Sequence, residues 1–307
     1  MPVTPARLIL HEVGLRDGLQ MEHASVPTER KLQWIQKLAE TGLDILQIGS
    51  FVHPTKVPQM ADTDELFRVL TAPGVLPEGV VLSGLVLNEK GLERGMAAGV
   101  PMFCMGVSAS ETHSRKNTGM SVAEAADRII AIAKQAVSAG RTVQVSVQSA
   151  FGCGYEGRVP EERVLSIVRR YLDAGLTTIS LADTAGHAAP DGVESLFTAV
   201  RNLDPTAELA CHFHNTYGMG LANCIAARRT GVTSFESSVA GLGGCPFTKI
   251  AGGNVCTEDL VHMLHRMGLR TDVRLDKIIA VAQDVAAFFG REMPGMIYKT
   301  GALTSSI

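Results

Sequence analysis

Eight short apolar runs recur along the chain, and helical patterns lie between them. The runs are RLILHEV (7–13), LDILQIG (43–49), GVVLSGLV (79–86), PMFCMGV (101–107), TVQVSV (142–147), TTISLA (177–182), LACHF (209–213) and TSFESSV (233–239). Repeated strand–helix units predict a parallel sheet, and eight of them match a closed (β/α)8 TIM barrel of the α/β class. A doubly wound sheet usually has fewer strands and a GxGxxG fingerprint after the first, and no such fingerprint follows the first run here.

The helical patterns also bear on the domain organisation. They include 28–42, 90–99, 122–140, 161–175 and 217–231, several of which end in the glycine expected just past a helix, and a further helix is predicted over about 274–290. No linker rich in proline, glycine or serine separates this last helix from the rest. We therefore expect a single domain over 1–307, with the barrel over about 7–270 and a C-terminal helix and tail over about 271–307.

Composition narrows the classes of partner. The 307 residues are 46% hydrophobic and carry a formal net charge of −3. Positive and negative residues are mixed along the sequence, so no cluster of basic residues suggests nucleic-acid binding. No apolar run approaches the roughly 18 residues of a membrane span, and no signal core is recognisable at the start. The six cysteines form no CxxC pair, which favours reduced thiols over a disulfide framework. We expect a cytoplasmic protein that binds small molecules.

His212 and His214 stand two apart in LACHFHNTYG (209–218), a stretch with the pattern of a buried strand. Side chains alternate between faces along a strand, so both imidazoles should point the same way. A buried imidazole is costly unless it has a hydrogen-bonding partner. Each could bond a local backbone carbonyl, but one metal ion would satisfy both.

The active site of such a barrel lies at the carboxyl ends of the strands. Arg16 and Asp17 follow the first run, and Asn254 lies in the loop after the eighth. Asp17, His212 and His214 would bring one carboxylate and two imidazoles together, and Asn254 could add an amide oxygen. Oxygen and nitrogen ligands without thiolate suit Mg²⁺ or Mn²⁺, although ligand type alone leaves Zn²⁺, Co²⁺ and Fe²⁺ open.

Six longer motifs resemble those of the hydroxymethylglutaryl-CoA lyase family, a branch of the metal-dependent lyase and carboligase barrels. They are EVGLRDGLQ (12–20), SFVHPTKVPQMAD (50–62), GCGYEGR (152–158), DTAGHAAP (183–190), HFHNTYGMGLAN (212–223) and SSVAGLGGCPFTKIAGGNVCTEDL (237–260). The resemblance extends over residues 7 to about 290. Carboligases that condense acetyl-CoA with 2-oxo acids share some of these elements, but the 50–62 motif and the GLGGCP loop favour the lyases.

The resemblance implies a reaction and a set of residues. The reaction is retro-Claisen cleavage of a 3-hydroxyacyl-CoA to acetyl-CoA and a keto product, as in leucine degradation. The implied metal ligands are Asp17, His212, His214 and Asn254. The implied catalytic residues are Arg16, Cys245 and Asp183, with Arg16 stabilising an enolate and Cys245, on a glycine-rich loop, transferring a proton. The other five cysteines are expected to be small buried side chains. A homodimer is also implied.

Substrate contacts are expected from a wider set of residues. Gln47 lies on the second predicted strand, Gln144 on one face of the fifth, and Thr184 directly after the sixth. The residues expected to contact the acyl-CoA are Arg16, Gln20, Gln47, Gln144, Ser110, Asn88, Lys90 and Thr184. Ser110, Asn88 and Lys90 are implied to meet the CoA arm, although a lysine after an asparagine at a helix start is also an ordinary surface residue.

Three positions depart from the pattern of the family that the chain resembles. Gln47 stands where a glutamate is usual, Gln144 where an arginine is usual, and Asn215 where an aspartate is usual. Loss of opposite charges at 47 and 144 would fit a replaced buried ion pair, whose two amides could bond each other or a neutral substrate group. Lys249 could meet a substrate carboxylate, or lie in solvent.

The departures leave several functions open. The chain could be a hydroxymethylglutaryl-CoA lyase, or a relative that cleaves another substrate such as one with a citramalyl-like skeleton. It could also act as a carboligase in the synthetic direction. The three neutral replacements alone would suit a non-catalytic acyl-CoA-binding protein.

Overall fold

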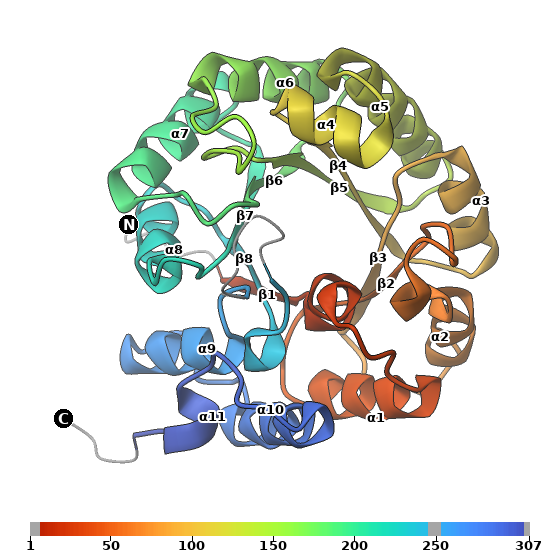
Figure 1. The fold of residues 1–307 in the computed structure, drawn as a ribbon, viewed down its shortest axis with the longest axis vertical. Helices are drawn as coiled ribbons and strands as arrows, with labels where there is room; N and C mark the ends of the chain where they lie inside the picture. Colours follow the sequence, from red (N-terminus) through yellow and green to blue (C-terminus); the bar gives the residue numbers. More distant parts are fainter. Residues whose placement is uncertain (1–6, 245–252, 304–307) are drawn as a thin grey trace, which may run out of the picture.

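The computed structural model describes residues 7–244 and 253–303. Eight parallel strands close into a barrel in chain order, because β1 pairs with both β2 and β8 (Figure 1). The strands are β1 (Ile9–Glu12), β2 (Ile45–Ser50), β3 (Val81–Leu85), β4 (Met102–Ser108), β5 (Thr142–Gln148), β6 (Thr178–Asp183), β7 (Glu208–Phe213) and β8 (Ser234–Ser237). Each apolar run coincides with one strand to within a residue or two at either end, so the predicted TIM barrel is confirmed.

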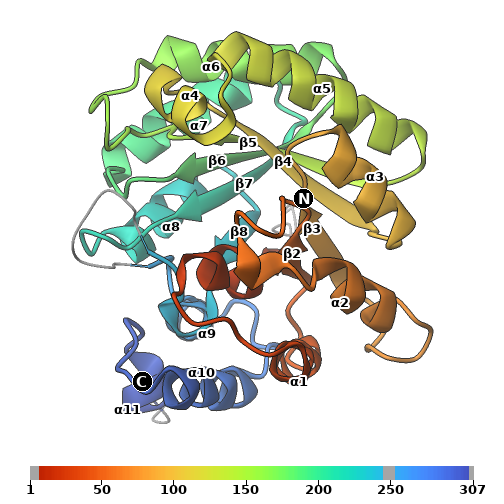
Figure 2. The same ribbon diagram turned by 45° about the vertical axis from the view of Figure 1, so that its right-hand side comes forward.

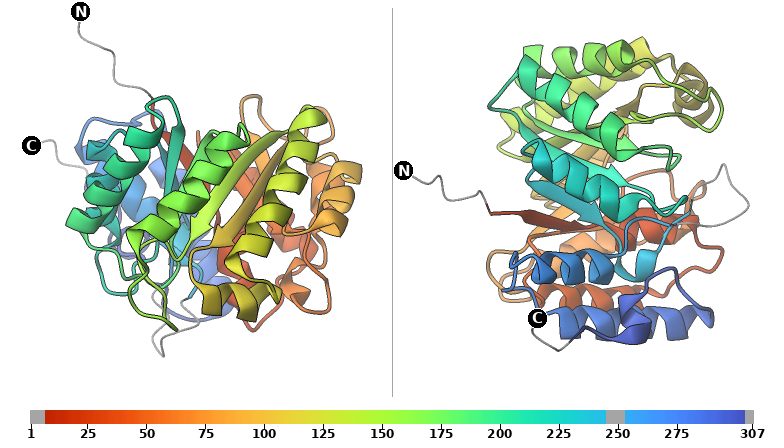
Figure 3. Two further views of the ribbon diagram at one scale, coloured as in Figure 1. Left: turned by 90° about the horizontal axis from the view of Figure 1, so that it is seen from above. Right: turned by 90° about the vertical axis from the view of Figure 1, so that its left-hand side faces the viewer.

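Helices surround the barrel in Figure 1, and the side views of Figure 3 show helices lying over the outside of the strands. They are α1 (Thr28–Ala39), α2 (Thr63–Leu70), α3 (Glu89–Ala97), α4 (Glu111–Thr118), α5 (Val122–Ser138), α6 (Glu161–Asp173), α7 (Pro190–Leu203), α8 (Gly220–Arg229), α9 (Thr257–Arg266), α10 (Leu275–Phe289) and α11 (Ile297–Thr300). Four shorter turns of helix also occur: η1 (Gly14–Gly18), η2 (Leu19–Met21), η3 (Pro58–Met60) and η4 (Val239–Gly241). All the helices predicted by range are present, and the predicted C-terminal helix is α10.

Local sequence explains where these helices begin and which face they bury. The start of α5 is a capping box, in which the Ser121 hydroxyl accepts from the Glu124 amide and the Glu124 carboxylate accepts from the Ser121 amide. The apolar residues of α5, among them Ala126, Ile129 and Ala133, are buried at helical spacing.

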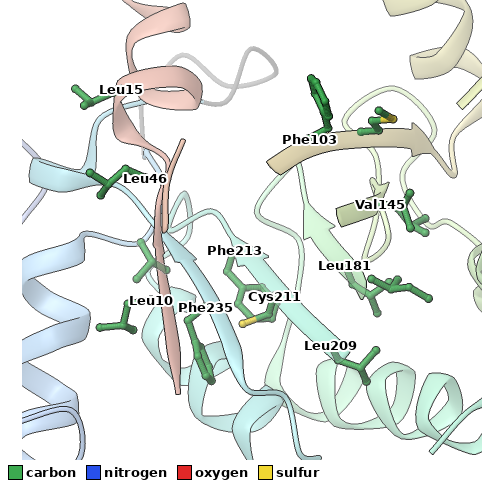
Figure 4. Close-up of a cluster of buried hydrophobic side chains, with 14 of the residues drawn as sticks. Leu10, Leu15, Leu46, Phe103, Val145, Leu181, Leu209, Cys211, Phe213 and Phe235 are labelled. Carbon is green, nitrogen blue, oxygen red and sulfur yellow. The ribbon is translucent and has the colours of Figure 1, made fainter. Parts of the chain in front are cut away.

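Strand alternation divides the barrel into two environments. Leu209, Cys211 and Phe213 of β7 lie in the hydrophobic cluster that the strands share with the helices (Figure 4). The alternate residue His212 faces the barrel interior, where it meets Glu236 of β8. Unlike most barrels of this class, whose interiors are filled by branched apolar side chains, this interior is rich in polar groups. The apolar side chains of the strands therefore pack outward against the helices. Polar side chains that hydrogen-bond to one another occupy the interior of the barrel.

The C-terminal helix α10 packs against α1 (Figure 2). The indole of Trp34, which is fully buried, donates to the Asp284 carboxylate at 2.9 Å. Arg30 also pairs with Asp284 at 3.2 Å, and the rings of Trp34 and Phe288 meet edge to face with centroids 5.5 Å apart. Hydrogen bonding, charge and ring packing thus join the two helices.

None of the helices in the described ranges combines the length and apolar content needed to cross a bilayer. The cysteines within those ranges are free and buried: Cys104, Cys153, Cys211, Cys224 and Cys256.

Candidate metal centre and active-site pocket

Three side chains from two distant parts of the chain converge at one end of the barrel. The turn η1, a π-helical turn just after β1, presents Asp17, while His212 is the second-last residue of β7 and His214 follows the strand. Candidate ligand atoms of the three lie within 4.8 Å of one another. Asp17 Oδ2 is 3.7 Å from His212 Nε2 and 3.8 Å from His214 Nε2. The two Nε2 atoms are 3.2 Å apart, so both imidazoles turn the same nitrogen toward the carboxylate.

Asn254 completes this group from the last loop. Its amide nitrogen donates to Asp17 Oδ2 at 2.9 Å and to the Leu242 carbonyl at 3.1 Å. Its buried Oδ1 has no hydrogen-bonding partner in the part of the chain that the structure describes. Buried polar atoms are rarely left unpaired, so this oxygen needs a partner. One carboxylate, two imidazoles and a free amide oxygen form a donor set that fits a divalent cation.

Arg16 lies beside the same carboxylate. Its Nη1 donates to Asp17 Oδ1 at 2.5 Å, and its Nε donates to Gln47 Oε1. Gln20 also donates to Asp17 Oδ1, at 3.2 Å. Burial by itself would raise the pKa of Asp17, but Arg16 and the nearby imidazoles outweigh it and hold that pKa well below its usual range. Asp17 is therefore ionised at neutral pH, with Oδ2 left to face the two histidines.

Glu236 is a functional candidate that the sequence analysis missed. Its carboxylate meets His212 Nδ1 at 2.9 Å, Gln144 Nε2 at 2.6 Å and the Ser180 hydroxyl at 3.1 Å. Burial opposes its charge, but the hydrogen bond and charge of His212 lower the pKa of Glu236 to about 2. The sequence does contain a feature that could have identified Glu236. It is an acidic residue within the apolar run TSFESSV, on the strand face opposite Phe235, and a buried charge is costly without a partner.

The two histidines differ in electrostatic environment. Burial lowers the pKa of His212, but the hydrogen bond and charge of Glu236 outweigh burial and raise it overall. Burial and the neighbouring His212 lower the pKa of His214 to about 4, so His214 is a neutral imidazole at neutral pH. A neutral imidazole is the form that binds a metal.

Glu12 joins the turn that carries Arg16 and Asp17 to the turn after β8. Its Oε1 accepts from the amides of Gly14 in η1 at 2.7 Å and Val239 in η4 at 2.9 Å. Its Oε2 accepts from Thr257 Oγ1 at 2.5 Å. Burial raises the pKa of Glu12 to about 7. This residue was not predicted from the sequence, and two of its three partners, Val239 and Thr257, lie more than two hundred positions away.

A pocket of about 300 Å³ opens beside these groups. Of the residues expected to bind substrate or catalyse, those that line it are Arg16, Gln20, Gln47, Gln144 and Thr184, together with Asp17, His212 and His214 of the candidate metal site. One wall is apolar and includes Val52, Val57, Leu85 and Leu87. The pocket thus joins a charged side to an apolar one.

Cys104 also lines the pocket, although the sequence analysis treated it as a small buried side chain. Burial raises the pKa of its thiol to about 12, so it is protonated at neutral pH.

Other expected site residues have local structural partners. Asn88 and Ser110 cap α3 and α4, where their side chains accept from the amides of Gly91 and His113. Lys90 is exposed, and none of these three lines the pocket. Their contact with substrate stays a prediction.

Asp183 and Asn215 also order loops. The Asp183 carboxylate accepts from the amides of His187 and Ala188, and burial raises its pKa to about 6. The Asn215 side chain accepts from the Gly220 amide at the start of α8. Asp183 does not line the pocket, so its catalytic role stays a prediction. Cys245 and Lys249 lie outside the described residues.

Comparison with known proteins identifies the family. Residues 7–285 match the model of the HMGL-like family. The chain belongs to this family. It is 40% identical to the hydroxymethylglutaryl-CoA lyase of Pseudomonas mevalonii over 279 residues, which cover 91% of both chains. It is 38% identical to the Bacillus subtilis enzyme over 291 residues, covering 94% of this chain and 96% of the relative.

Solved structures agree with this assignment. An HMG-CoA lyase from Acinetobacter baumannii, in complex with coenzyme A and 3-methylmalate, superposes with a TM-score of 0.91 at 36% identity, covering 100% of this chain and 99% of that one. The B. subtilis lyase gives a TM-score of 0.92 at 36% identity, covering 98% and 99%. This member of the HMGL-like family is therefore a lyase.

Proposed function

We propose that this chain is a divalent-metal-dependent lyase that cleaves hydroxymethylglutaryl-CoA, or a close analogue, to acetyl-CoA and a keto product. For hydroxymethylglutaryl-CoA the keto product is acetoacetate. The observation that carries the proposal is the convergence of Asp17, His212 and His214 on one point beside Arg16, at the edge of the pocket. The full-length relatives named hydroxymethylglutaryl-CoA lyase support the choice of substrate class.

The reaction breaks the bond between C2 and C3 of the substrate. The C3 hydroxyl loses its proton and becomes the carbonyl of the keto product. The electron pair of the broken bond passes to the thioester as an enolate, which takes up a proton at C2 to form acetyl-CoA. The barrier is therefore set by how well the site tolerates negative charge on two oxygens in turn.

The residues of the site can stabilise negative charge on both the C3 oxygen and the enolate oxygen. Mg²⁺ or Mn²⁺ held by Asp17, His212, His214 and Asn254 would supply positive charge where the C3 oxygen becomes negative. Arg16 lines the pocket, so its positively charged guanidinium can stabilise the enolate oxygen. The hydrogen bond from Arg16 to the neutral Gln47 holds the guanidinium in place without neutralising it.

The metal site is tested by removing its ligands. His212→Ala and Asp17→Ala should each lower kcat/KM for acetyl-CoA release by roughly 10³-fold, because metal catalysis supplies several kcal/mol of transition-state stabilisation. The assay uses hydroxymethylglutaryl-CoA and hydroxyacyl-CoA analogues with added Mn²⁺ or Mg²⁺. His262→Ala, on α9 and outside the pocket, is the matched control and should keep wild-type activity. Full activity of chelator-treated, metal-free protein would overturn the proposal.

Cys245 is proposed as the proton-transfer residue on the basis of the family resemblance alone. Cys245→Ser should lower kcat by about 10²- to 10⁴-fold and leave KM little changed, the usual effect of losing a positioned acid or base. Alkylation should inactivate the wild type but leave the residual rate of Cys245→Ser unchanged, since Cys104, which lines the described part of the pocket, is protonated and so reacts slowly. Equal inactivation of both proteins would reject this role.

We also infer from the family resemblance a cytoplasmic homodimer that acts in leucine degradation. Light scattering of the purified protein tests the assembly.

A further inference from the structure

The interior of the barrel contains a carboxylate that no step of the proposed reaction uses. Glu236 lies on β8 directly beside His212 on β7, because the two residues are register partners in the sheet. Both side chains face the interior, and one oxygen of the carboxylate is 2.9 Å from His212 Nδ1. A carboxylate at this distance holds the imidazole in one orientation by accepting a hydrogen bond from its Nδ1–H.

The orientation of the ring decides which nitrogen is free. With Nδ1 engaged by Glu236, the Nε2 atom of His212 points toward Asp17 and His214, 3.7 Å from Asp17 Oδ2. Rotation of the ring would exchange the two nitrogens and leave a proton facing the metal site. In a neutral imidazole, the contact with Glu236 therefore keeps the proton on Nδ1 and leaves Nε2 available for a metal.

Side chains from two other strands of the barrel also hold Glu236 in place. Gln144 of β5 and Ser180 of β6 both donate to its Oε1, at 2.6 Å and 3.1 Å, while Oε2 serves His212. The glutamate side chain is only 7% exposed, so these partners take the place of water. Because Gln144 and Ser180 are neutral, they fix the carboxylate without pairing with its charge.

We propose that Glu236 is a positioning residue that sets His212 as a metal ligand, and that Gln144 acts through Glu236. The inference rests on the proposed metal site and gives Gln144 a role besides the expected contact with substrate. A purely structural role is the alternative, in which Glu236 only satisfies buried polar neighbours. The two roles differ in one measurable property, the affinity of the folded apoprotein for a metal.

The test is a titration of metal-free protein with Mn²⁺ alone, followed by calorimetry, with circular dichroism confirming the fold of each variant. Glu236→Gln preserves the size of the side chain and removes its charge. It should weaken Mn²⁺ binding by about 10- to 100-fold, the usual cost of losing a ligand's outer partner. Gln144→Leu should weaken binding by less, since Ser180 still holds Glu236. Ser83→Ala is the matched control, because it removes a buried hydrogen bond to His11 in the same interior and leaves Glu236 untouched.

A second readout covers the case in which a variant is unstable. The rise in Tm caused by saturating Mn²⁺ should be smaller in Glu236→Gln than in wild type or Ser83→Ala, whatever the Tm of the apoprotein. Unchanged Mn²⁺ affinity in Glu236→Gln, with binding lost in His212→Ala, would overturn the positioning role and leave the proposed function standing. A wild-type protein that binds no Mn²⁺ would overturn the metal site and this inference together.

Discussion

Gln47 and Gln144 are neutral side chains, and each has a charged partner of its own. Gln47 accepts from Arg16, whereas Gln144 donates to Glu236. The expectation that these two amides bond each other is therefore not what the structure shows. Strand parity indicated that both point inward but carried no information about which neighbour each would meet. Two separate contacts also mean that a charge introduced at either position would find an opposite charge already in place.

Introducing a charge at position 47 or 144, one at a time, tests whether each glutamine has its own charged partner. Gln47→Glu should form an ion pair with Arg16, and Gln144→Arg one with Glu236, so neither single change leaves a buried charge unpaired. The effects of the two substitutions on the free energy of unfolding should add to within about 0.5 kcal/mol in the double variant. Urea unfolding of the four proteins measures the coupling. A favourable coupling of about 1 kcal/mol or more would show instead that residues 47 and 144 act as a pair.

At the scale of elements, the turn η1 carries Arg16 and Asp17 and contacts η4, and two buried carboxylates hold these two turns. Glu12 bonds both η1 and η4, and Glu258 at the start of α9 accepts from the Ala240 amide of η4 at 3.0 Å. Ala240 has a φ of 60°, a conformation that costs about 1–2 kcal/mol for a residue with a side chain. The hydrogen bonds to η4 offset this cost, and they keep the end of the β8 segment close to Arg16 and Asp17.

Glu258 should make the stability of the protein depend on pH. Burial raises its pKa from about 4.5 to about 8, so the folded state holds this proton more tightly than the unfolded chain does. Its contribution is fully present below about pH 4.5 and is lost as the pH rises through about 8, at up to about 1.4 kcal/mol per pH unit. Glu258→Gln, which resembles the protonated form, should flatten this decline.

Urea unfolding between about pH 5 and about pH 8 measures the slope for both proteins. Glu12, whose pKa burial raises to about 7, contributes a decline of the same sign and should remain in the variant. Identical slopes in wild type and Glu258→Gln would show that Glu258 is not protonated in the folded state.

At the scale of the whole molecule, closure of the barrel places residues from both ends of the sequence in one site. Pairing of β1 with β8 brings Asp17 against Asn254, 237 positions later. The C-terminal helix α10 then covers α1, with Asp284 bonding both Trp34 and Arg30. We propose that residues 271–307 fold with the barrel as one domain rather than forming an appendage.

Truncation tests this proposal. A chain ending at Val273 should fail to fold, because it exposes the fully buried Trp34 and the apolar face of α1. Asp284→Ala gives a milder, folded case and should lower the free energy of unfolding by about 1–3 kcal/mol, since it leaves the buried indole donor unpaired. Glu292→Ala, which removes an exposed ion pair with Lys299, is the control and should leave the free energy of unfolding close to that of the wild type. A cooperative unfolding transition in the truncated chain would contradict the single-domain proposal.

The sequence by itself determined the barrel, its strands and the group of residues Asp17, His212 and His214. These follow from local rules: apolar periodicity identifies strands, alternation assigns side chains to faces, and strand ends meet at one rim. Only the tertiary structure decided the partners, such as Glu236 for His212 and Arg16 for Gln47. A partner depends on the register and closure of strands far apart in the chain, and on distances of a few ångströms between side chains. The periodicity of apolar residues predicts neither the register nor these distances, because it describes each strand or helix separately and not how they pack together.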